Sequence, residues 1–316
     1  MNDTIITIVT PFHNESAAIS KYFNSLNSVI TTLQDFSFEI LCIDDGSTDD
    51  TLSQLIAHAD QDPRIRVIEL SRNFGKEAAL SAGIDLARGA AVIPIDADLQ
   101  DPPELIPLMI KSWLNGNDIV LARRTNRDSD SYFKRKTAEW FYQIHNNISQ
   151  VKIPHNVGDF RLVDRSVIDA LKRLPEGQRF MKGLFAWAGF KSGVIDYTRP
   201  ERSAGTSKFP GIKLWNLALE GITSFSTAPL KIWTYLGAFS AAITFLYAAF
   251  ILIRTLVYGI DVPGYASLMV VVLFFGSIQL ISVGILGEYI GRTYMESKRR
   301  PVYLIRKEYG KYPHGT

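Results

Sequence analysis

Carboxylates gather directly after an apolar run of the chain, in the stretch "PIDADLQDPPE" at residues 94–104. Asp96 and Asp98 stand where that run ends, and Asp101 follows three residues later. Hard divalent cations take oxygen ligands, and Mg²⁺ commonly uses one or two carboxylates together with substrate phosphates. We therefore predict a site for Mg²⁺ or Mn²⁺ at Asp96 and Asp98, with Gln100 as a further ligand. Acidic residues beside "PPE" also suit the first turn of a helix, so Asp101 is assigned a structural role.

The acidic stretch is one of three polar clusters that follow apolar, β-rich runs. The other two are "PFHNE" at residues 11–15 and "DDGSTDD" at residues 44–50. Such runs, at 4–11, 38–44, 65–71, 90–96 and 117–122, alternate with helical patterns at 48–60, 75–89 and 102–116. This alternation predicts an α/β domain with a mostly parallel sheet and helices on both faces. Ligands of such sheets bind at the carboxyl ends of the strands, so the three clusters are expected to meet at one crevice.

The C-terminal third of the chain differs from the rest. Residues Ile232–Ile253 and Ala266–Gly287 are each 22 residues long and contain no charged side chain. About 20 apolar residues are needed to cross a bilayer as a helix. Basic residues follow the second stretch, and basic flanks stay on the cytoplasmic side. We predict two transmembrane helices with both termini in the cytoplasm and the short connector outside. The basic residues of the tail at 296–316 are Lys298, Arg299, Arg300, Arg306, Lys307 and Lys311.

Composition limits the other possibilities. The formal net charge is +2, so nothing in it suggests nucleic-acid binding. Cys42 is the only cysteine and lies in an apolar run, which predicts a small core residue and excludes an internal disulfide. The chain enters its first apolar run with no basic region and no cleavage site, so no signal peptide is expected and the first half is predicted to be cytosolic.

The motifs together resemble a known family. "VTPFHNE", "IDDGSTDDT", "LSRNFGKEAALSAGIDLA", "IDADLQDPPE" and "VGDFRLVDR" are similar to those of the inverting family 2 glycosyltransferases with the GT-A fold. Within that family they look most like the polyprenyl-phosphate sugar transferases related to dolichol-phosphate mannose synthase. The C-terminal stretches "KLWNLALEGITSFSTAPLKIWTYLG" and "GILGEYIGRTYMESKRRP" resemble the bacterial bactoprenol glucosyltransferases found with O-antigen-modifying systems. The resemblance covers essentially the whole chain.

The resemblance implies a nucleotide-sugar site, which is lined by Pro11, Asn14, Glu15, Asp44, Asp45, Lys76 and Asp96. A carboxylate there accepts a hydrogen bond from a uracil N–H or a ribose hydroxyl. Turn and cap chemistry is the alternative role for Asp44 and Asp45. Lys76 follows "NFG" at an expected helix start, where a cation and backbone N–H groups meet phosphate. A solvated surface lysine is the alternative there.

The acceptor implied by the resemblance is a polyprenyl phosphate. Arg123 and Arg135 are expected to contact its phosphate, with Arg124 and Arg161 as further basic residues of the same site. Guanidinium groups suit two-pronged contact with phosphate, although basic residues near a membrane also hold anionic headgroups. Asp159 resembles the active-site aspartate of the family, and a helix cap or a surface ion pair is its alternative role. The catalytic residues are thus expected to be Asp98, Asp159, Arg123 and Arg135.

The expected protein has four parts: a cytosolic GT-A domain at 1–205, an amphipathic interfacial segment at 206–231, a transmembrane hairpin at 232–290 and a basic cytosolic tail at 291–316. A helix in the second part that packs on the catalytic domain is the alternative to one in the lipid interface. The reaction expected is transfer of a sugar, glucose by resemblance, from a UDP-sugar to undecaprenyl phosphate at the bacterial inner membrane. The resemblance also implies a homo-oligomer, a tetramer, and downstream flippase and glycosyltransferase partners.

Three other functions compete with this interpretation. A processive polysaccharide synthase shares the fold, but the chain has no QxxRW motif and "GQRF" at 177–180 does not match it. A non-enzymatic membrane scaffold is disfavoured by the intact Asp96, Asp98 and Asp159. A membrane-anchored sugar nucleotidyltransferase would release pyrophosphate in place of UDP.

Overall fold

The computed structural model describes residues 4–125, 157–174, 176, 181–198, 228–258 and 264–310. Arg135, the "GQRF" stretch and most of the expected interfacial segment, 206–227, lie outside the described residues. The strands are β1 (Ile5–Phe12), β2 (Ser37–Asp44), β3 (Ile65–Leu70), β4 (Ala91–Pro94), β5 (Ile119–Arg124), β6 (Val157–Asp164), β7 (Ser192–Tyr197) and β8 (Ile305–Tyr309). The helices are α1 (Ile19–Ile30), α2 (Thr51–Gln61), α3 (Lys76–Leu86), the short 3-10 helix η1 (Pro103–Leu105), α4 (Ile106–Leu114), α6 (Arg165–Lys172), α7 (Met181–Ala188), α9 (Ala228–Tyr258) and α10 (Tyr265–Ser297).

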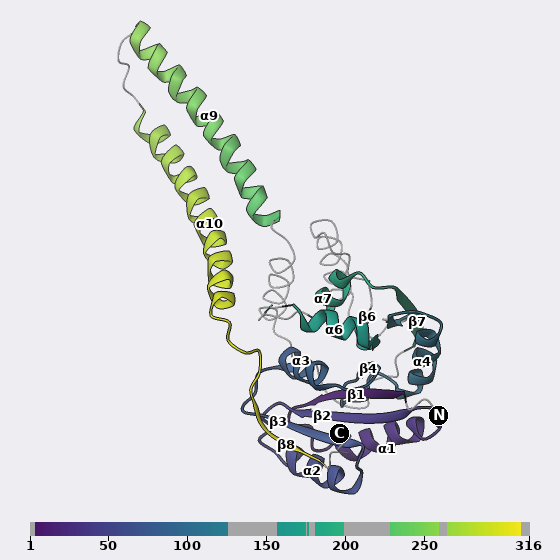
Figure 1. Cartoon of the computed structure of the whole chain (residues 1–316). Coiled ribbons are helices and arrows are strands. Elements are labelled where there is room, and N and C mark those ends of the chain that lie inside the picture. The colour runs from purple at the N-terminus through teal and green to yellow at the C-terminus, as the bar shows by residue number, and fades with distance from the viewer. Residues whose placement is uncertain are drawn as a thin grey trace.

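One sheet contains the eight described strands in the order β7-β5-β6-β4-β1-β2-β3-β8 (Figure 1). Four neighbouring strands run parallel to one another, in the order β4, β1, β2 and β3. Strand β6 runs antiparallel to both of its neighbours, β4 and β5. The parallel strands are nearly continuous buried apolar runs, as expected where helices cover both faces. Cys42 is fully buried on β2. The predicted α/β fold with a mostly parallel sheet is confirmed. The strands and helices that were expected between residues 4 and 122 lie near their predicted positions, whereas helix α1 was not predicted.

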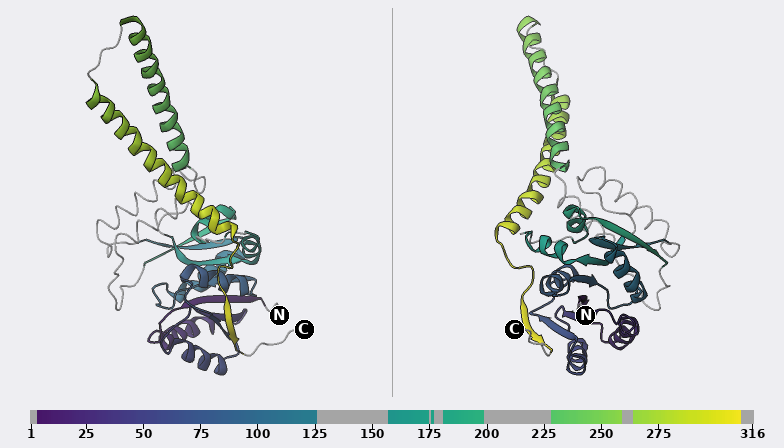
Figure 2. Two further views of the ribbon diagram at one scale, coloured as in Figure 1. Left: turned by 90° about the vertical axis from the view of Figure 1, so that its left-hand side faces the viewer. Right: turned by 45° about the vertical axis from the view of Figure 1, so that its right-hand side comes forward.

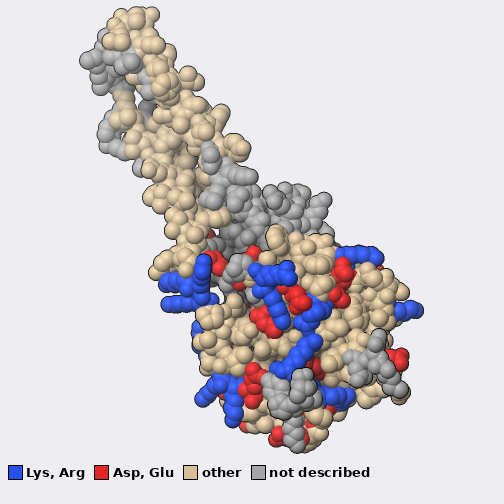
Figure 3. All heavy atoms as spheres, viewed as in Figure 1, with Lys and Arg blue, Asp and Glu red and all other residues tan. Residues whose placement is uncertain are grey.

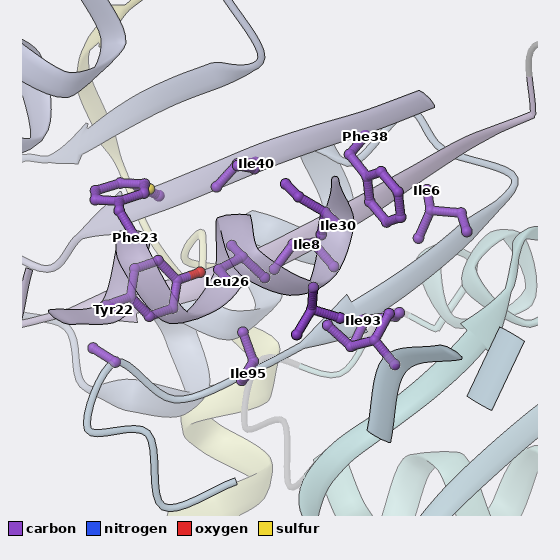
Figure 4. Packing of buried hydrophobic residues seen from close by; sticks show 14 of the residues in the cluster. Ile6, Ile8, Tyr22, Phe23, Leu26, Ile30, Phe38, Ile40, Ile93 and Ile95 are labelled. Atoms are coloured by element: carbon purple, nitrogen blue, oxygen red, sulfur yellow. The ribbon is translucent and has the colours of Figure 1, made fainter. Parts of the chain in front are cut away.

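Successive residues of the strands divide between two apolar clusters, one on each face of the sheet. On one face, Tyr22 and Leu26 of α1 pack with Ile8 of β1 (Figure 4). On the other face, α3, α6 and α7 pack against the alternate residues of the same strands. A Cβ added at Gly83 of α3 would lie 2.1 Å from Cγ1 of Val9, so only glycine allows α3 to approach β1 this closely.

Helices α9 and α10 extend away from the sheet as a long hairpin (Figures 1 and 2). The segments Tyr235–Tyr258 and Val270–Ser297 are long and apolar enough to cross a membrane, and their most apolar windows are not buried in the protein. Charged side chains are concentrated on the sheet domain and at the base of the hairpin (Figure 3). The two predicted apolar spans fall within α9 and α10, which are therefore candidate membrane spans.

The tail that follows α10 returns to the sheet. Strand β8 pairs antiparallel with β3 at the edge of the sheet, and Ser71 N donates a hydrogen bond of 2.9 Å to the carbonyl of Leu304 (Figure 2). Tyr303 on the same tail donates to Asp85 of α3 at 3.2 Å. The sequence predicted only a basic tail here. Strand β8 has five residues and is rich in charge, so it shows no clear alternation of apolar and polar residues.

Candidate active site

The three polar clusters meet at one cleft of about 290 Å³ where β1, β2 and β4 end. As expected from the order of the strands, each cluster contributes side chains to it. The lining residues are Pro11, Phe12, His13, Glu15, Asp45, Asn73, Gly75, Lys76, Ala79, Asp96, Ala97 and Asp98. The predicted meeting of the strand-end clusters is therefore observed.

Hydrogen bonds between loops hold one wall of the cleft. Both carboxylate oxygens of Asp45 accept from backbone N–H groups, one from Phe74 at 2.7 Å and the other from Gly75 at 2.9 Å. Gly46 has φ +62°, and a Cβ there would lie 2.5 Å from the carbonyl carbon of Arg72, so glycine lets the two loops touch. Asn14, at φ +55°, accepts from Thr48 N at 2.8 Å. Asp45 and Asn14 therefore fix the loops around the cleft.

Lys76 is the first residue of α3 and bridges two carboxylates. Its Nζ lies 2.8 Å from Oδ2 of Asp96 and 3.0 Å from Oδ2 of Asp159. Burial lowers the pKa of Lys76, but Asp96 and Asp159 outweigh that effect and raise the pKa above its usual value. Burial raises the pKa of Asp96, which the nearby ammonium opposes. The predicted helix start is confirmed, and it holds a cation between the end of β4 and strand β6.

Asp98 and Glu15 make the other side of the cleft acidic. Asp98 accepts from the backbone N–H of Gln100 at 3.0 Å, across a turn in which Leu99 has φ +54°. Burial raises the pKa of Glu15, and the charges of Asp98, Asp49 and Asp96 raise it further. Accumulated negative charge of this kind favours a cation.

The carboxylates of Asp96 and Asp98 fit a hard divalent ion that takes most of its ligands from a bound substrate and from water. Within the described residues, no group of three or more His, Cys, Asp or Glu side chains is arranged to hold a metal. Asp96 and Asp98 nevertheless line the same cleft. One or two carboxylates, with phosphate oxygens and water, are a usual ligand set for Mg²⁺.

Asp44, the last residue of β2, precedes Asp45 of the cleft lining but does not itself line the cleft. It is 1% exposed, and its Oδ1 has no hydrogen-bond partner among the described residues. Its Oδ2 accepts from Ser47 N at 3.2 Å. A buried acceptor without a donor is costly, so a ligand N–H or O–H at this oxygen would be stabilising.

The two arginines at the end of β5 are engaged by other parts of the domain. Arg123 donates two hydrogen bonds, of 2.7 and 2.9 Å, to the carboxylate of Asp196 on β7. Arg124 donates to the hydroxyl of Tyr197 at 3.1 Å and lies 3.5 Å from Asp101. Tyr197 in turn donates to the buried Asp101 at 2.8 Å. Arg124 thus belongs to a structural network, and Arg123 has a carboxylate partner on the surface.

Arg161 lies beneath Asp159 on β6. Its side chain donates to the backbone carbonyls of Gly158 at 2.8 Å and Asp159 at 3.2 Å, and its guanidinium stacks on the ring of Phe185. The residue is only 3% exposed. This geometry favours a role in positioning Asp159 over direct contact with an acceptor.

Comparison with known proteins identifies the family. Residues 7–172, more than half of the chain, match the family described as Glycosyl transferase family 2. The chain belongs to that family. Residues 228–293 of this glycosyltransferase match a second description, the GtrB C-terminal hairpin, which covers α9 and most of α10.

Curated relatives match the glycosyltransferase over nearly its full length. The bactoprenol glucosyl transferase of Shigella phage SfV is 54% identical over 96% of this chain and 98% of its own. The prophage bactoprenol glucosyl transferase homolog of Escherichia coli K12 is 52% identical over 96% and 98%. Among solved structures, glucosyl-3-phosphoglycerate synthase of Mycobacterium tuberculosis superposes with a TM-score of 0.45 at 20% identity, covering 70% of this chain and 78% of its own.

Two polar side chains of the glycosyltransferase cleft, those of His13 and Asn73, were not singled out from the sequence. The Nδ1 atom of His13 lies 2.9 Å from the carbonyl oxygen of Asp45, and its Nε2 lies 2.9 Å from Nδ2 of Asn73. Both residues line the cleft. They stand inside the motifs "PFHNE" and "SRNFGK", so their position beside the predicted residues was the available signal.

Proposed function

We propose that this chain transfers glucose from UDP-glucose to undecaprenyl phosphate (bactoprenol), with inversion at the anomeric carbon, to supply a lipid-linked sugar for modification of O-antigen or another envelope glycan. The observation that carries the proposal is 54% identity, over 98% of its length, to a protein named bactoprenol glucosyl transferase. The cleft at the ends of β1, β2 and β4 supports it, since that edge of a parallel sheet is where nucleotides bind.

The nucleophile needs no strong base. A phosphate monoester has a second pKa of about 6, so the acceptor is mostly a dianion at cytosolic pH. One of its oxygens attacks C1 of the sugar as the bond from C1 to the UDP oxygen breaks, and UDP leaves with the electron pair. Catalysis is then mainly a matter of bringing two anions together in the correct orientation.

The N-terminus of α3 suits the donor diphosphate. Lys76 supplies an ammonium group there, and the backbone N–H groups of the first turn add partial positive charge. To contact phosphate, Lys76 would exchange part of its interaction with Asp96 or Asp159 for the new anion. Asp159 serves to hold Lys76 and to orient the acceptor, and a role as general base is not required.

Asp96 and Asp98, which line the cleft, are the residues that would hold Mg²⁺ or Mn²⁺. Gln100 is kept as an additional oxygen ligand, although it is not among the residues that line the cleft. Such an ion, when bound, neutralises charge that develops on a leaving diphosphate. Glu15 lines the same cleft as Asp96 and Asp98, and this gathering of carboxylates supports a cation there.

The acceptor phosphate is assigned to Arg123 and Arg135, with Arg124 and Arg161 in supporting roles. Arg123 is exposed and already makes a two-pronged contact with a carboxylate, which a phosphate would match in shape and charge. Arg124 pairs with Asp101, and Arg161 donates a hydrogen bond to the backbone carbonyl of Asp159.

The pairing of β8 with β3 supports the proposed membrane arrangement. Because the two strands share a sheet, the chain must cross the membrane an even number of times between them. Two crossings by α9 and α10 satisfy this condition. The proposed parts of the chain then divide near residues 205, 231 and 290, and both termini lie on the cytoplasmic side of the inner membrane. A reporter protein that works only outside the cytoplasm should then be active when it is inserted near Asp261. A reporter that works only in the cytoplasm should be active when it is fused after Thr316. The opposite pattern would contradict the arrangement.

The decisive experiment for the activity is product identification. Purified protein is incubated with undecaprenyl phosphate and, separately, with several UDP-sugars, and the lipid product is identified by its mass. We expect glucosyl undecaprenyl phosphate and stoichiometric UDP. Transfer of a different hexose would correct the sugar, release of pyrophosphate would indicate a nucleotidyltransferase, and no turnover of any sugar would favour a scaffold.

The proposed homo-oligomer, a tetramer, is tested by chromatography coupled to light scattering. The proposed flippase and glycosyltransferase partners are tested by co-purification from membranes.

A further inference from the structure

Strand β8 places two polar side chains of the C-terminal tail on a single residue of the sheet. Tyr309 donates a hydrogen bond of 2.8 Å to Oε2 of Glu69, and Nη1 of Arg306 lies 3.3 Å from Oε1 of the same carboxylate. Glu69 is only 8% exposed, while the side chain of Arg306 is 70% exposed. The tail therefore satisfies both oxygens of a largely buried carboxylate that belongs to β3.

Glu69 is the neighbour of Asp44 in the sheet. The two residues are paired in the parallel register of β2 and β3, at the end of β2 that leads into the cleft. Burial raises the pKa of Asp44, and the negative charge of Glu69 adds to this effect, while hydrogen bonds from Ser47 oppose it. The charge and the position of Glu69 thus act directly on Asp44.

Asp44 in turn presents the buried oxygen that lacks a hydrogen-bond partner among the described residues. When a uracil nucleotide binds in the cleft, we expect this oxygen to accept a hydrogen bond from its base or ribose. Its ability to accept depends on a carboxylate that stays ionised and is held in one orientation.

We propose that Arg306 and Tyr309 are positioning residues for the base end of the nucleotide site, which act on Asp44 through Glu69. The segment that leaves the membrane hairpin thereby takes part in donor recognition, although it contributes no residue to the cleft lining described above. This inference rests on the proposed function, because it requires that a uracil nucleotide binds beside Asp44.

The test uses the difference between uracil and cytosine. The N3–H group of uracil can donate a hydrogen bond to a carboxylate, whereas N3 of cytosine can only accept one. Asp44 should therefore favour UDP over CDP. Binding of each nucleotide to the full-length protein in detergent is measured by calorimetry. For Tyr309→Phe we expect the preference for UDP to fall about threefold to tenfold, a partial loss of one charge-assisted hydrogen bond. For Arg306→Gln we expect about twofold, because exposed ion pairs contribute little.

Two comparisons separate this role from general support of the sheet. Arg300→Gln removes the same charge from the tail at an exposed residue outside β8 and should leave both nucleotides unaffected. In a Glu69→Gln background, where the charge next to Asp44 is gone, Arg306→Gln should have no further effect. Transfer assays should show a raised KM for UDP-glucose with kcat and the KM for undecaprenyl phosphate unchanged.

The outcomes distinguish this inference from the function on which it rests. If the wild-type protein shows no preference for UDP over CDP, the nucleotide role of Asp44 and this inference both fail. If the wild type prefers UDP and both variants keep that preference, only the role of the tail is refuted. Equal weakening of UDP and CDP in Tyr309→Phe would also refute it, since that result means β8 merely stabilises the edge of the sheet.

Discussion

The two halves of the sheet carry their functional side chains in different ways. At the ends of β1, β2 and β4, acidic residues face a cleft, and Lys76 lies between Asp96 and Asp159 inside the same group. At β5 and β7, by contrast, Arg123 and Arg124 are bound by acidic or hydroxyl partners of their own half. The first half is a formed site with excess negative charge, and the second is a set of cations already paired.

This difference has a consequence for how two anionic substrates would meet. At the proposed donor end, hydrogen bonds such as those of Asp45 fix the loops around the cleft. At the proposed acceptor end, a phosphate would have to replace Asp196 as the partner of Arg123. We therefore expect substitutions in the first half to affect catalysis as a whole, and those in the second to affect use of the acceptor.

The largest effect is expected from Asp98→Asn, which removes one charge from the proposed metal site. Loss of an electrostatic stabiliser of the leaving group should lower turnover by about a hundredfold or more, with the protein still folded and in the membrane. Turnover of UDP-glucose is the measurement, with Asp35→Asn, an exposed loop residue, as the matched control. Full activity of the variant, or of the wild type in excess EDTA, would show that the metal assignment is wrong.

Lys76→Met should have the next largest effect, because it removes the ammonium group that lies between Asp96 and Asp159. Misplacement of catalytic groups by about an ångström can cost up to about a hundredfold, and we expect a loss of tenfold to a hundredfold in turnover on that scale. Binding of UDP should weaken as well, which calorimetry can measure. Lys111→Met, an exposed lysine on α4, is the control. Unchanged UDP binding would assign Lys76 to the carboxylates alone.

Arg123→Lys tests the acceptor half. Lysine keeps the charge but loses the two-pronged contact, so efficiency with undecaprenyl phosphate should fall about tenfold while the KM for UDP-glucose is unchanged. Arg135→Lys is expected to behave in the same way. Asp196→Asn sharpens the comparison, because weakening the resident partner of Arg123 should improve acceptor use if the phosphate competes with that carboxylate. A loss of donor binding in Arg123→Lys would instead assign this arginine to the diphosphate.

The smallest effect on activity is expected from Tyr197→Phe, which removes a hydrogen bond to the buried Asp101. We expect a loss of about 1–3 kcal/mol in the free energy of unfolding and little change in donor KM. Burial and Asp101 raise the pKa of Tyr197 from 10.0 to about 12. The hydroxyl therefore stabilises the fold below pH 10, and this contribution is lost as the pH rises toward 12. Denaturant unfolding at pH 8 and pH 11 should show the loss in the wild type, and a smaller dependence on pH in the variant.

Local pattern was sufficient for several parts of this protein. Continuous apolar runs predicted β1 to β5, because each parallel strand is buried on both faces, and helical spacing predicted α2, α3 and α4. Helix α1 was not predicted. Polar residues after β1, β2 and β4 predicted the cleft, since parallel strands place their carboxyl ends at one edge. The two long uncharged stretches predicted α9 and α10 from length alone.

Only the tertiary structure decided which distant side chains meet. Lys76 and Asp159 are 83 residues apart in the chain, and Glu69 and Tyr309 are 240 apart, yet each pair is joined by a hydrogen bond. The same holds for Arg124, whose charge suggested a phosphate but whose partners are Tyr197 and Asp101. Periodicity reports which face of an element is buried, whereas the order of strands in a sheet sets the neighbours of each residue. That order arises from the packing of the whole chain, so the sequence pattern predicted the chemical groups of the site and the fold determined their partners.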